Sequence, residues 1–219
     1  MLFSMGVLLD KSEVSVILLA GKELSLCAWM GYHNRMAQHI LFLHGAGEGA
    51  YKEDSLLAQR LQRELGTGYT VSCPELPDEA NAPYELWKQR VEKEIHGMQE
   101  PVILVGHSIG GSHLAKIMTE VQADKPVAGI FLLEAPFWGG EGWHYEGYKE
   151  IEIPEESFSK LPKGAKIFIY HTRDDEIVPF DHLALYAKHI PQAVVREIAT
   201  GGHQLADTIT PLVEDIRNL

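Results

Sequence analysis

Short apolar runs recur along the chain and alternate with segments of helical periodicity. Runs of four to seven aliphatic and β-branched residues are typical of strands buried on both faces of a sheet. They occur at residues 40–43, 69–73, 101–105, 127–133, 165–170 and 193–198. Because strands that alternate with helices need crossover connections, the pattern predicts a mostly parallel sheet with helices on both faces.

Helical periodicity fills the intervals between these strands. Between Asp54 and Leu65 the leucines recur every three or four positions among charged and amide residues, and Gly66 marks the end. Further helices are predicted over residues 83–97, 112–118, 180–189 and 205–217. The 219 residues contain no internal repeat or linker composition, so one domain covering residues 1–219 is expected.

The N-terminal part departs from this alternation. Residues 14–19 and 24–29 are apolar runs separated by four residues that include Gly21, which predicts an antiparallel hairpin. The first ten residues lack the basic segment and long apolar core of a signal peptide. Cys27 and Cys73 lie in apolar stretches, as buried thiols do. We therefore expect a cytoplasmic protein in a reducing compartment.

Charge narrows the choice of partner more than the choice of fold. The net charge is −12, with 45% hydrophobic and 23% charged residues. A field of this sign repels phosphates, so neither nucleic acid nor an anionic membrane is expected as a partner. The sequence has no His-Glu-x-x-His or Cys-x-x-Cys spacing and no Gly-Lys-Ser/Thr ending after its glycines near residue 47. No metal and no cofactor are therefore expected, and the oligomeric state is left open.

The candidate chemistry centres on Ser108. Residues 106–111 read Gly-His-Ser-Ile-Gly-Gly and lie between the apolar run at 101–105 and a predicted helix. A serine at the apex of a strand–turn–helix needs small neighbours, because strand and helix pass closely, and Gly106 and Gly110 meet this need. The pattern resembles the nucleophile elbow of the α/β-hydrolase family.

A serine hydroxyl is a weak nucleophile unless a base removes its proton and a third group orients that base. The resemblance implies the chain order serine, acid, histidine. Residues 171–179 read His-Thr-Arg-Asp-Asp-Glu-Ile-Val-Pro and are similar to the family's Asp-x-x-Val-Pro turn, which places the acid at Asp175. Asp174 is the competing candidate. Residues 200–204, Thr-Gly-Gly-His-Gln, follow the last strand, and their glycines free the backbone to bring His203 over the elbow as the base.

Two further turns are assigned roles through the same resemblance. The His-Gly turn after the strand at 40–43 supplies a backbone N–H to the family's oxyanion hole, and by position that donor is Ala46. The second donor is Ile109, directly after the nucleophile. His44 and His107 flank these turns, and we expect them to border the substrate pocket and support its loops through hydrogen bonds to the backbone.

The segment from Glu134 to Glu156 is rich in aromatic residues and glycine and holds seven glutamates against one lysine. Ligands of open parallel sheets bind beyond the carboxyl ends of the strands, where this segment begins. It lies in a predicted insertion, 134–160, that is too short for a large helical lid, so a minimal cap is expected. The alternative is an ordered loop that packs its aromatics over the sheet edge. The residues predicted to line a pocket beside the nucleophile are Phe137, Trp138, Trp143 and Tyr145.

Taken in order, these turns are similar to those of small, lid-poor serine hydrolases of the carboxylesterase and dienelactone-hydrolase type, although dienelactone hydrolase itself uses cysteine. The resemblance implies an α/β-hydrolase fold and an acyl-enzyme mechanism, and we expect the substrate to be a small ester or thioester. Because the net charge of −12 and the glutamates of residues 134–156 repel anions, a neutral substrate is expected. Two alternatives stay open. One is a non-catalytic binding protein with the same fold. The other is use of the same triad for acyl transfer, perhydrolysis or carbon–carbon bond hydrolysis.

Overall fold

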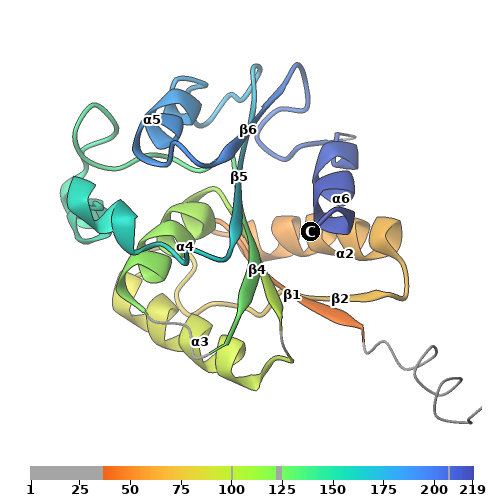
Figure 1. The fold of residues 1–219 in the computed structure, drawn as a ribbon. Coiled ribbons are helices and arrows are strands. Elements are labelled where there is room, and N and C mark those ends of the chain that lie inside the picture. Colours follow the sequence, from red (N-terminus) through yellow and green to blue (C-terminus); the bar gives the residue numbers. More distant parts are fainter. Residues whose placement is uncertain (1–36, 100, 122–124, 207) are drawn as a thin grey trace, which may run out of the picture. The chain divides into compact units, whose positions relative to one another are not determined.

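The computed structural model describes residues 37–219 except 100, 122–124 and 207, and in this part the strands form one open, parallel sheet (Figure 1). Its order is β2-β1-β3-β4-β5-β6. From β1 the chain therefore passes to the edge strand β2, returns to β3 on the other side of β1, and then proceeds strand by strand to β6. The strands are β1 (Gln38–Leu43), β2 (Tyr69–Ser72), β3 (Val102–His107), β4 (Val127–Leu133), β5 (Lys166–Thr172) and β6 (Val194–Ile198).

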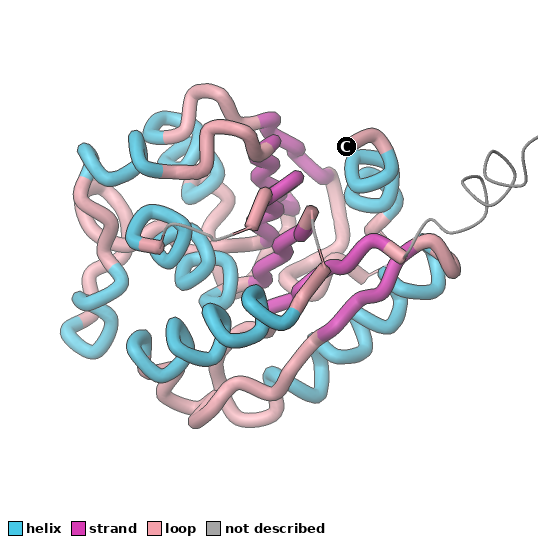
Figure 2. Tube along the Cα trace, turned by 60° about the horizontal axis from the view of Figure 1, so that its bottom comes forward, coloured by secondary structure: helices cyan, strands magenta, loops and turns pink. Residues whose placement is uncertain are grey.

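Helices cover both faces of this sheet (Figure 2). On one face lie α2 (Ala50–Leu65) and α6 (Thr210–Arg217). The other face carries α3 (Tyr84–Gly97), α4 (Ile109–Glu120) and α5 (His182–His189). The short 3-10 helices η1 (Glu146–Ile151) and η2 (Glu155–Lys160) contribute Ile151 and Phe158 to the core on this second face.

The two cores explain why the inner strands contain uninterrupted apolar runs, whereas the edge strands β2 and β6 also carry polar residues. In β1, Leu41 and Leu43 pack toward the layer of α3 and α4, whereas Ile40 and Phe42 pack toward α2 and α6. All four side chains are fully buried. Since successive side chains of a strand point to opposite faces, a sheet covered on both sides requires apolar residues at every position.

The predicted α/β architecture is confirmed, including the parallel sheet and the two helical layers. The last helix begins at Thr210 rather than at residue 205, because turns occupy residues 202–206 and Pro211 suits only the first turn of a helix. Cys73 is half-buried, and burial raises the pKa of its thiol to about 12.

Some predictions fall on residues that the structure does not describe. The hairpin at 14–29 and Cys27 lie outside the described residues. Residues 36–219 make up one compact unit of the chain. Within the described residues, none of the helices has the length and apolar character needed to span a bilayer.

Candidate active site

Ser108 occupies a strained turn between β3 and α4. Its backbone has φ 52° and ψ −129°, a positive φ that residues other than glycine seldom adopt. A Cβ atom added to Gly106 would lie 2.6 Å from the carbonyl oxygen of Gly110, and one added to Gly110 would lie 2.3 Å from that of His44. Both positions therefore require glycine, as the sequence pattern predicts for a nucleophile elbow.

His203 is held by the carboxylate of Asp175. The imidazole Nδ1 lies 2.8 Å from Asp175 Oδ2, and the other carboxylate oxygen accepts the backbone N–H groups of Ile177 (2.8 Å) and Val178 (2.9 Å). Burial alone raises the pKa of Asp175, but the neighbouring imidazoles of His171 and His203 outweigh it and hold that pKa well below its usual range. Asp175 is therefore an anion that fixes the imidazole orientation.

The two acids that flank Asp175 bind the backbone of the same turn. Asp174 accepts the N–H of Gly202 at 2.9 Å, and Glu176 accepts the N–H of His203 at 3.2 Å. Of the two carboxylates considered from the sequence, the structure brings Asp175 to the imidazole and directs Asp174 to the glycine backbone. Three consecutive acids thus hold the loop of His203, each through a different atom of that loop.

A cavity of about 270 Å³ opens above Ser108. The cavity brings together Ser108, His203 and Ala46, three residues that the sequence analysis predicts at one site. Ile109 begins α4, so its N–H has no acceptor within the helix and lies at the positive end of the helix dipole. The lining residues are Gly45, Ala46, Ala50, Glu53, Asp54, His107, Ser108, Glu176, Ile177, His203 and Gln204.

The predicted aromatic wall is not part of this lining. Phe137 packs against Tyr186 with ring centroids 5.1 Å apart, and Trp138 donates its indole N–H to Ser112 on α4. Trp143 meets the Trp138 ring edge-on, and Tyr145 is exposed. Residues 137–148 thus form the ordered, aromatic-packed loop of the alternative interpretation.

Acidic residues line the cavity instead, and sequence reasoning missed them. Glu53 and Asp54 lie in the first turns of α2, soon after the turn that contains Ala46, and Glu176 directly follows Asp175. Their position just beyond the carboxyl ends of β1 and β5, in the first turns of α2 and in the loop after β5, was available as a signal, because ligands of open parallel sheets bind at that edge.

His44 supports the turn after β1 without lining the cavity. Its Nδ1 donates to the carbonyl of Gly45 at 2.7 Å, and its Nε2 accepts the N–H of Leu76 at 2.9 Å. One nitrogen donates and the other accepts, so the ring is neutral. Burial lowers the pKa of His44, in agreement with this state.

His107 does line the cavity and forms a second imidazole–carboxylate pair. Its Nδ1 lies 2.8 Å from Asp54 Oδ2, which also accepts the N–H of Gly45 at 2.7 Å. Its Nε2 donates to the backbone carbonyl of His203 at 2.8 Å. Burial opposes protonation, but the charge of Asp54 outweighs it and raises the pKa of His107. Both ring nitrogens donate, so His107 is an imidazolium that holds the loop of His203.

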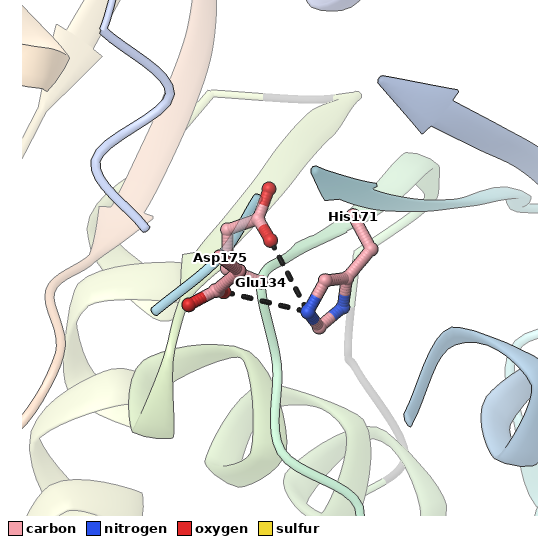
Figure 3. A group of neighbouring side chains, drawn as sticks. All are labelled: Glu134, His171 and Asp175. Carbon is pink, nitrogen blue, oxygen red and sulfur yellow. Dashed lines mark ion pairs between the residues drawn. The ribbon is translucent and has the colours of Figure 1, made fainter. Parts of the chain in front are cut away.

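Within the part of the chain that the structure describes, one group of side chains has the spacing of a metal site: Glu134, His171 and Asp175 (Figure 3). Their candidate ligand atoms lie within 4.8 Å of one another. His171 Nε2, however, donates its proton to the carbonyl of Val178 at 2.9 Å, and Asp175 Oδ2 accepts from His203. The atoms that would bind a metal are therefore already used in hydrogen bonds, and the group is a hydrogen-bonded network that does not fit a metal ion.

Fold and site together define an α/β-hydrolase with a serine nucleophile elbow. The family model described as serine hydrolase matches residues 54–209, and the chain belongs to this family. The YdeN protein of Bacillus subtilis (strain 168) is 27% identical over 162 residues, which cover 71% of this chain and 82% of YdeN.

Solved structures show the same fold. The crystal structure of the ydeN gene product from B. subtilis has a TM-score of 0.63 at 21% identity and covers 83% of this chain and 97% of its own. The meta-cleavage product hydrolase CumD from Pseudomonas fluorescens IP01 has a TM-score of 0.64 at 16% identity, covering 83% and 91%. Est1E from Butyrivibrio proteoclasticus, with ferulic acid bound, has a TM-score of 0.63 at 13% identity, and the match covers 85% of this chain and 89% of Est1E.

Proposed function

We propose that this serine hydrolase cleaves a small, neutral carboxylic ester or thioester through an acyl-enzyme intermediate. The observation that carries the proposal is the convergence of three groups. Ser108 sits on a strained elbow, His203 lines the same cavity, and the imidazole of His203 is oriented by Asp175 at 2.8 Å. A nucleophile, a base and an orienting acid in this relation are the parts that acyl transfer to serine needs.

Each step then has an assigned group. Ser108 Oγ attacks the carbonyl carbon while His203 Nε2 takes its proton, and Asp175 stabilises the imidazolium that forms. The backbone N–H groups of Ala46 and Ile109 receive the oxyanion. Collapse of the tetrahedral intermediate expels the alkoxide or thiolate, to which His203 returns the proton. Water repeats the sequence on the acyl-enzyme and releases the carboxylic acid.

The size and the charge of the cavity lining support the proposal of a small and uncharged substrate. Its volume of about 270 Å³ lies just below the range of roughly 300–1,000 Å³ that holds drug-sized ligands. Its lining includes Glu53, Asp54 and Glu176 but no lysine or arginine. An anionic substrate would meet an unfavourable potential there, whereas Ala50 and the exposed side chain of Ile177 offer apolar contact.

A fluorophosphonate probe tests the nucleophile directly. We expect one labelled site in the wild-type protein and no labelling or ester hydrolysis in Ser108→Ala, because the probe reacts with an activated serine. Ser159→Ala, at an exposed serine of η2, is the matched control and should label fully. Undiminished labelling of Ser108→Ala would overturn the proposal. A series of p-nitrophenyl esters of increasing chain length beside a thioester then defines the acyl group and the leaving group, with short acyl chains expected to react fastest.

A further inference from the structure

Glu134 is a buried acid that the proposed mechanism does not use. It directly follows β4, adjacent to the β3 strand that ends before Ser108. Its residue is fully buried, and its φ of 49° is a second strained backbone at the same edge of the sheet. Strain of this kind persists where the surrounding structure enforces it, most often at functional sites. The surrounding structure therefore holds this carboxylate beside the proposed catalytic residues at the cost of backbone strain.

The carboxylate of Glu134 lies beside that of Asp175, and within the described residues neither carboxylate is paired with a lysine or an arginine. Their oxygens come within 4.8 Å of each other and approach the same nitrogen, His171 Nε2, at 3.3 and 3.4 Å (Figure 3). The proton on that nitrogen is directed to the carbonyl of Val178 at 2.9 Å. Arg173, the nearest arginine in sequence, pairs outward with an exposed glutamate. Two buried carboxylates this close cannot both ionise.

The hydrogen bonds decide which of the two is charged. Asp175 accepts two backbone N–H groups and the imidazole N–H of His203, all of which favour its anion. Glu134 accepts the backbone N–H of Thr172, at 3.0 and 3.1 Å from its two oxygens. Burial, followed by the neighbouring Asp175, raises the pKa of Glu134 to about 10, whereas that of Asp175 is held well below its usual range.

We propose that Glu134 is a neutral carboxylic acid that donates its proton in a hydrogen bond to the Asp175 carboxylate, and that it is thereby a positioning residue for the His203–Asp175 pair. The consequence for catalysis rests on the proposed function. Asp175 is then held on one side by backbone N–H groups and on the other by an acid. Its orientation toward His203 is then fixed from both sides.

The protonation state is tested without any substrate. At neutral pH the infrared spectrum of the wild-type protein should contain the C=O stretch of a buried protonated carboxyl, and Glu134→Gln should remove it. Absence of that band from the wild-type spectrum, or its survival in Glu134→Gln, would overturn the proposal. Both outcomes are independent of whether Ser108 is the nucleophile.

The pH dependence of thermal unfolding gives a second readout. A carboxyl with a raised pKa binds its proton in the folded protein and releases it on unfolding, so stability falls as pH rises from about 4.5 to about 10. Glu134→Gln has no such proton, so its Tm should exceed that of the wild type by a margin that widens over this range. The described titratable groups that face Glu134 are His171 at the end of β5 and Asp174 and Asp175 in the next loop, with His203 beyond Asp175. A margin that is constant with pH would contradict the proposal.

Kinetics separate positioning from mere packing. Glu134→Gln retains a donor for Asp175 and an acceptor for the N–H of Thr172, so kcat should stay within about threefold of wild type. Glu134→Met has a similar size but no donor, and kcat should fall about 10- to 100-fold at unchanged KM, the range for a lost hydrogen bond to a charged group. Equal loss in both variants would show that the carboxyl proton is not what matters. If Ser108→Ala keeps its activity, the proposed function fails while the infrared and unfolding results still stand.

Discussion

Two buried imidazole–carboxylate pairs flank Ser108, and they differ in one hydrogen bond. His203 with Asp175 and His107 with Asp54 each show 2.8 Å between Nδ1 and Oδ2, and their imidazole rings lie 4.8 Å apart. The second nitrogen of His107 donates to a backbone carbonyl, whereas the ring of His203 borders the cavity beside the serine. An imidazole–carboxylate pair therefore does not by itself identify a catalytic base. What identifies the base is a second ring nitrogen that is available to the substrate in the cavity.

The difference suits one pair to proton transfer and the other to structural support. A base must gain and lose a proton within one turnover, which requires an imidazole that is neutral at rest. His107 donates through both nitrogens and is charged at rest, so it cannot accept the proton of Ser108. Its bond to the carbonyl of His203 instead holds the loop of His203, the proposed base.

Replacing each histidine by glutamine gives the largest expected contrast. His203→Gln should lower kcat by about six orders of magnitude, the scale seen when a serine protease loses its base. His107→Gln should lower kcat only about tenfold but should destabilise the fold by about 3–5 kcal/mol, because Asp54 is left buried and unpaired. Ester turnover and thermal unfolding measured side by side check both expectations.

Removing the stranded charge serves as the control for this contrast. The double substitution His107→Gln with Asp54→Asn should regain part of the lost Tm, since neither partner is then a buried ion. If His107→Gln abolishes turnover in protein that is still folded, or if His203→Gln remains active, the two pairs have been assigned in the wrong order.

The carboxylates can be compared in the same way, with a smaller effect. Asp175→Asn should leave the shape intact but favour the wrong imidazole tautomer, and turnover should fall by about 10⁴, as in the serine-protease precedent. Asp174→Asn keeps an oxygen that can accept the N–H of Gly202, so turnover should change less than tenfold. Steady-state kcat values for both variants decide the matter, and a reversal of the two phenotypes would make Asp174 the triad acid.

The fold could be predicted from the sequence, and so could three of the residues that line the cavity, Ala46, Ser108 and His203. Uninterrupted apolar strands predicted a sheet covered on both faces, and this holds because β1 feeds two separate cores. Ser108 and His203 were predicted from glycine-rich turns, whose backbone requirements are local and therefore visible in sequence. Gly106 and Gly110 illustrate this, since a Cβ at either position would clash with the backbone.

Longer-range contacts were not visible in the same way. Asp54 lies 53 residues from His107 in sequence, and as part of an amphipathic helix it was indistinguishable from any solvated acid. Glu134 was counted among the glutamates of an acidic loop, although it is fully buried. The aromatic residues were predicted to line the cavity because the sequence could not show which side of their loop packs on α4. Burial of a polar residue depends on tertiary contacts that a local pattern does not contain.

The smallest expected effect is the salt dependence of kcat/KM, which comes from cavity carboxylates outside the two imidazole–carboxylate pairs. His107 balances Asp54, whereas Glu53 and Glu176 are exposed at the cavity and add to a net charge of −12. Repulsion by exposed charges is screened by salt, with a Debye length of about 10 Å at 0.1 M. For an anionic ester kcat/KM should therefore rise a few-fold between about 0.01 and 0.3 M salt, whereas for its neutral isostere it should stay nearly flat. Glu53→Gln should reduce the slope for the anionic ester and leave the neutral one unchanged. An anionic ester that reacts faster than its neutral isostere at low salt would show that the potential at the cavity is not negative.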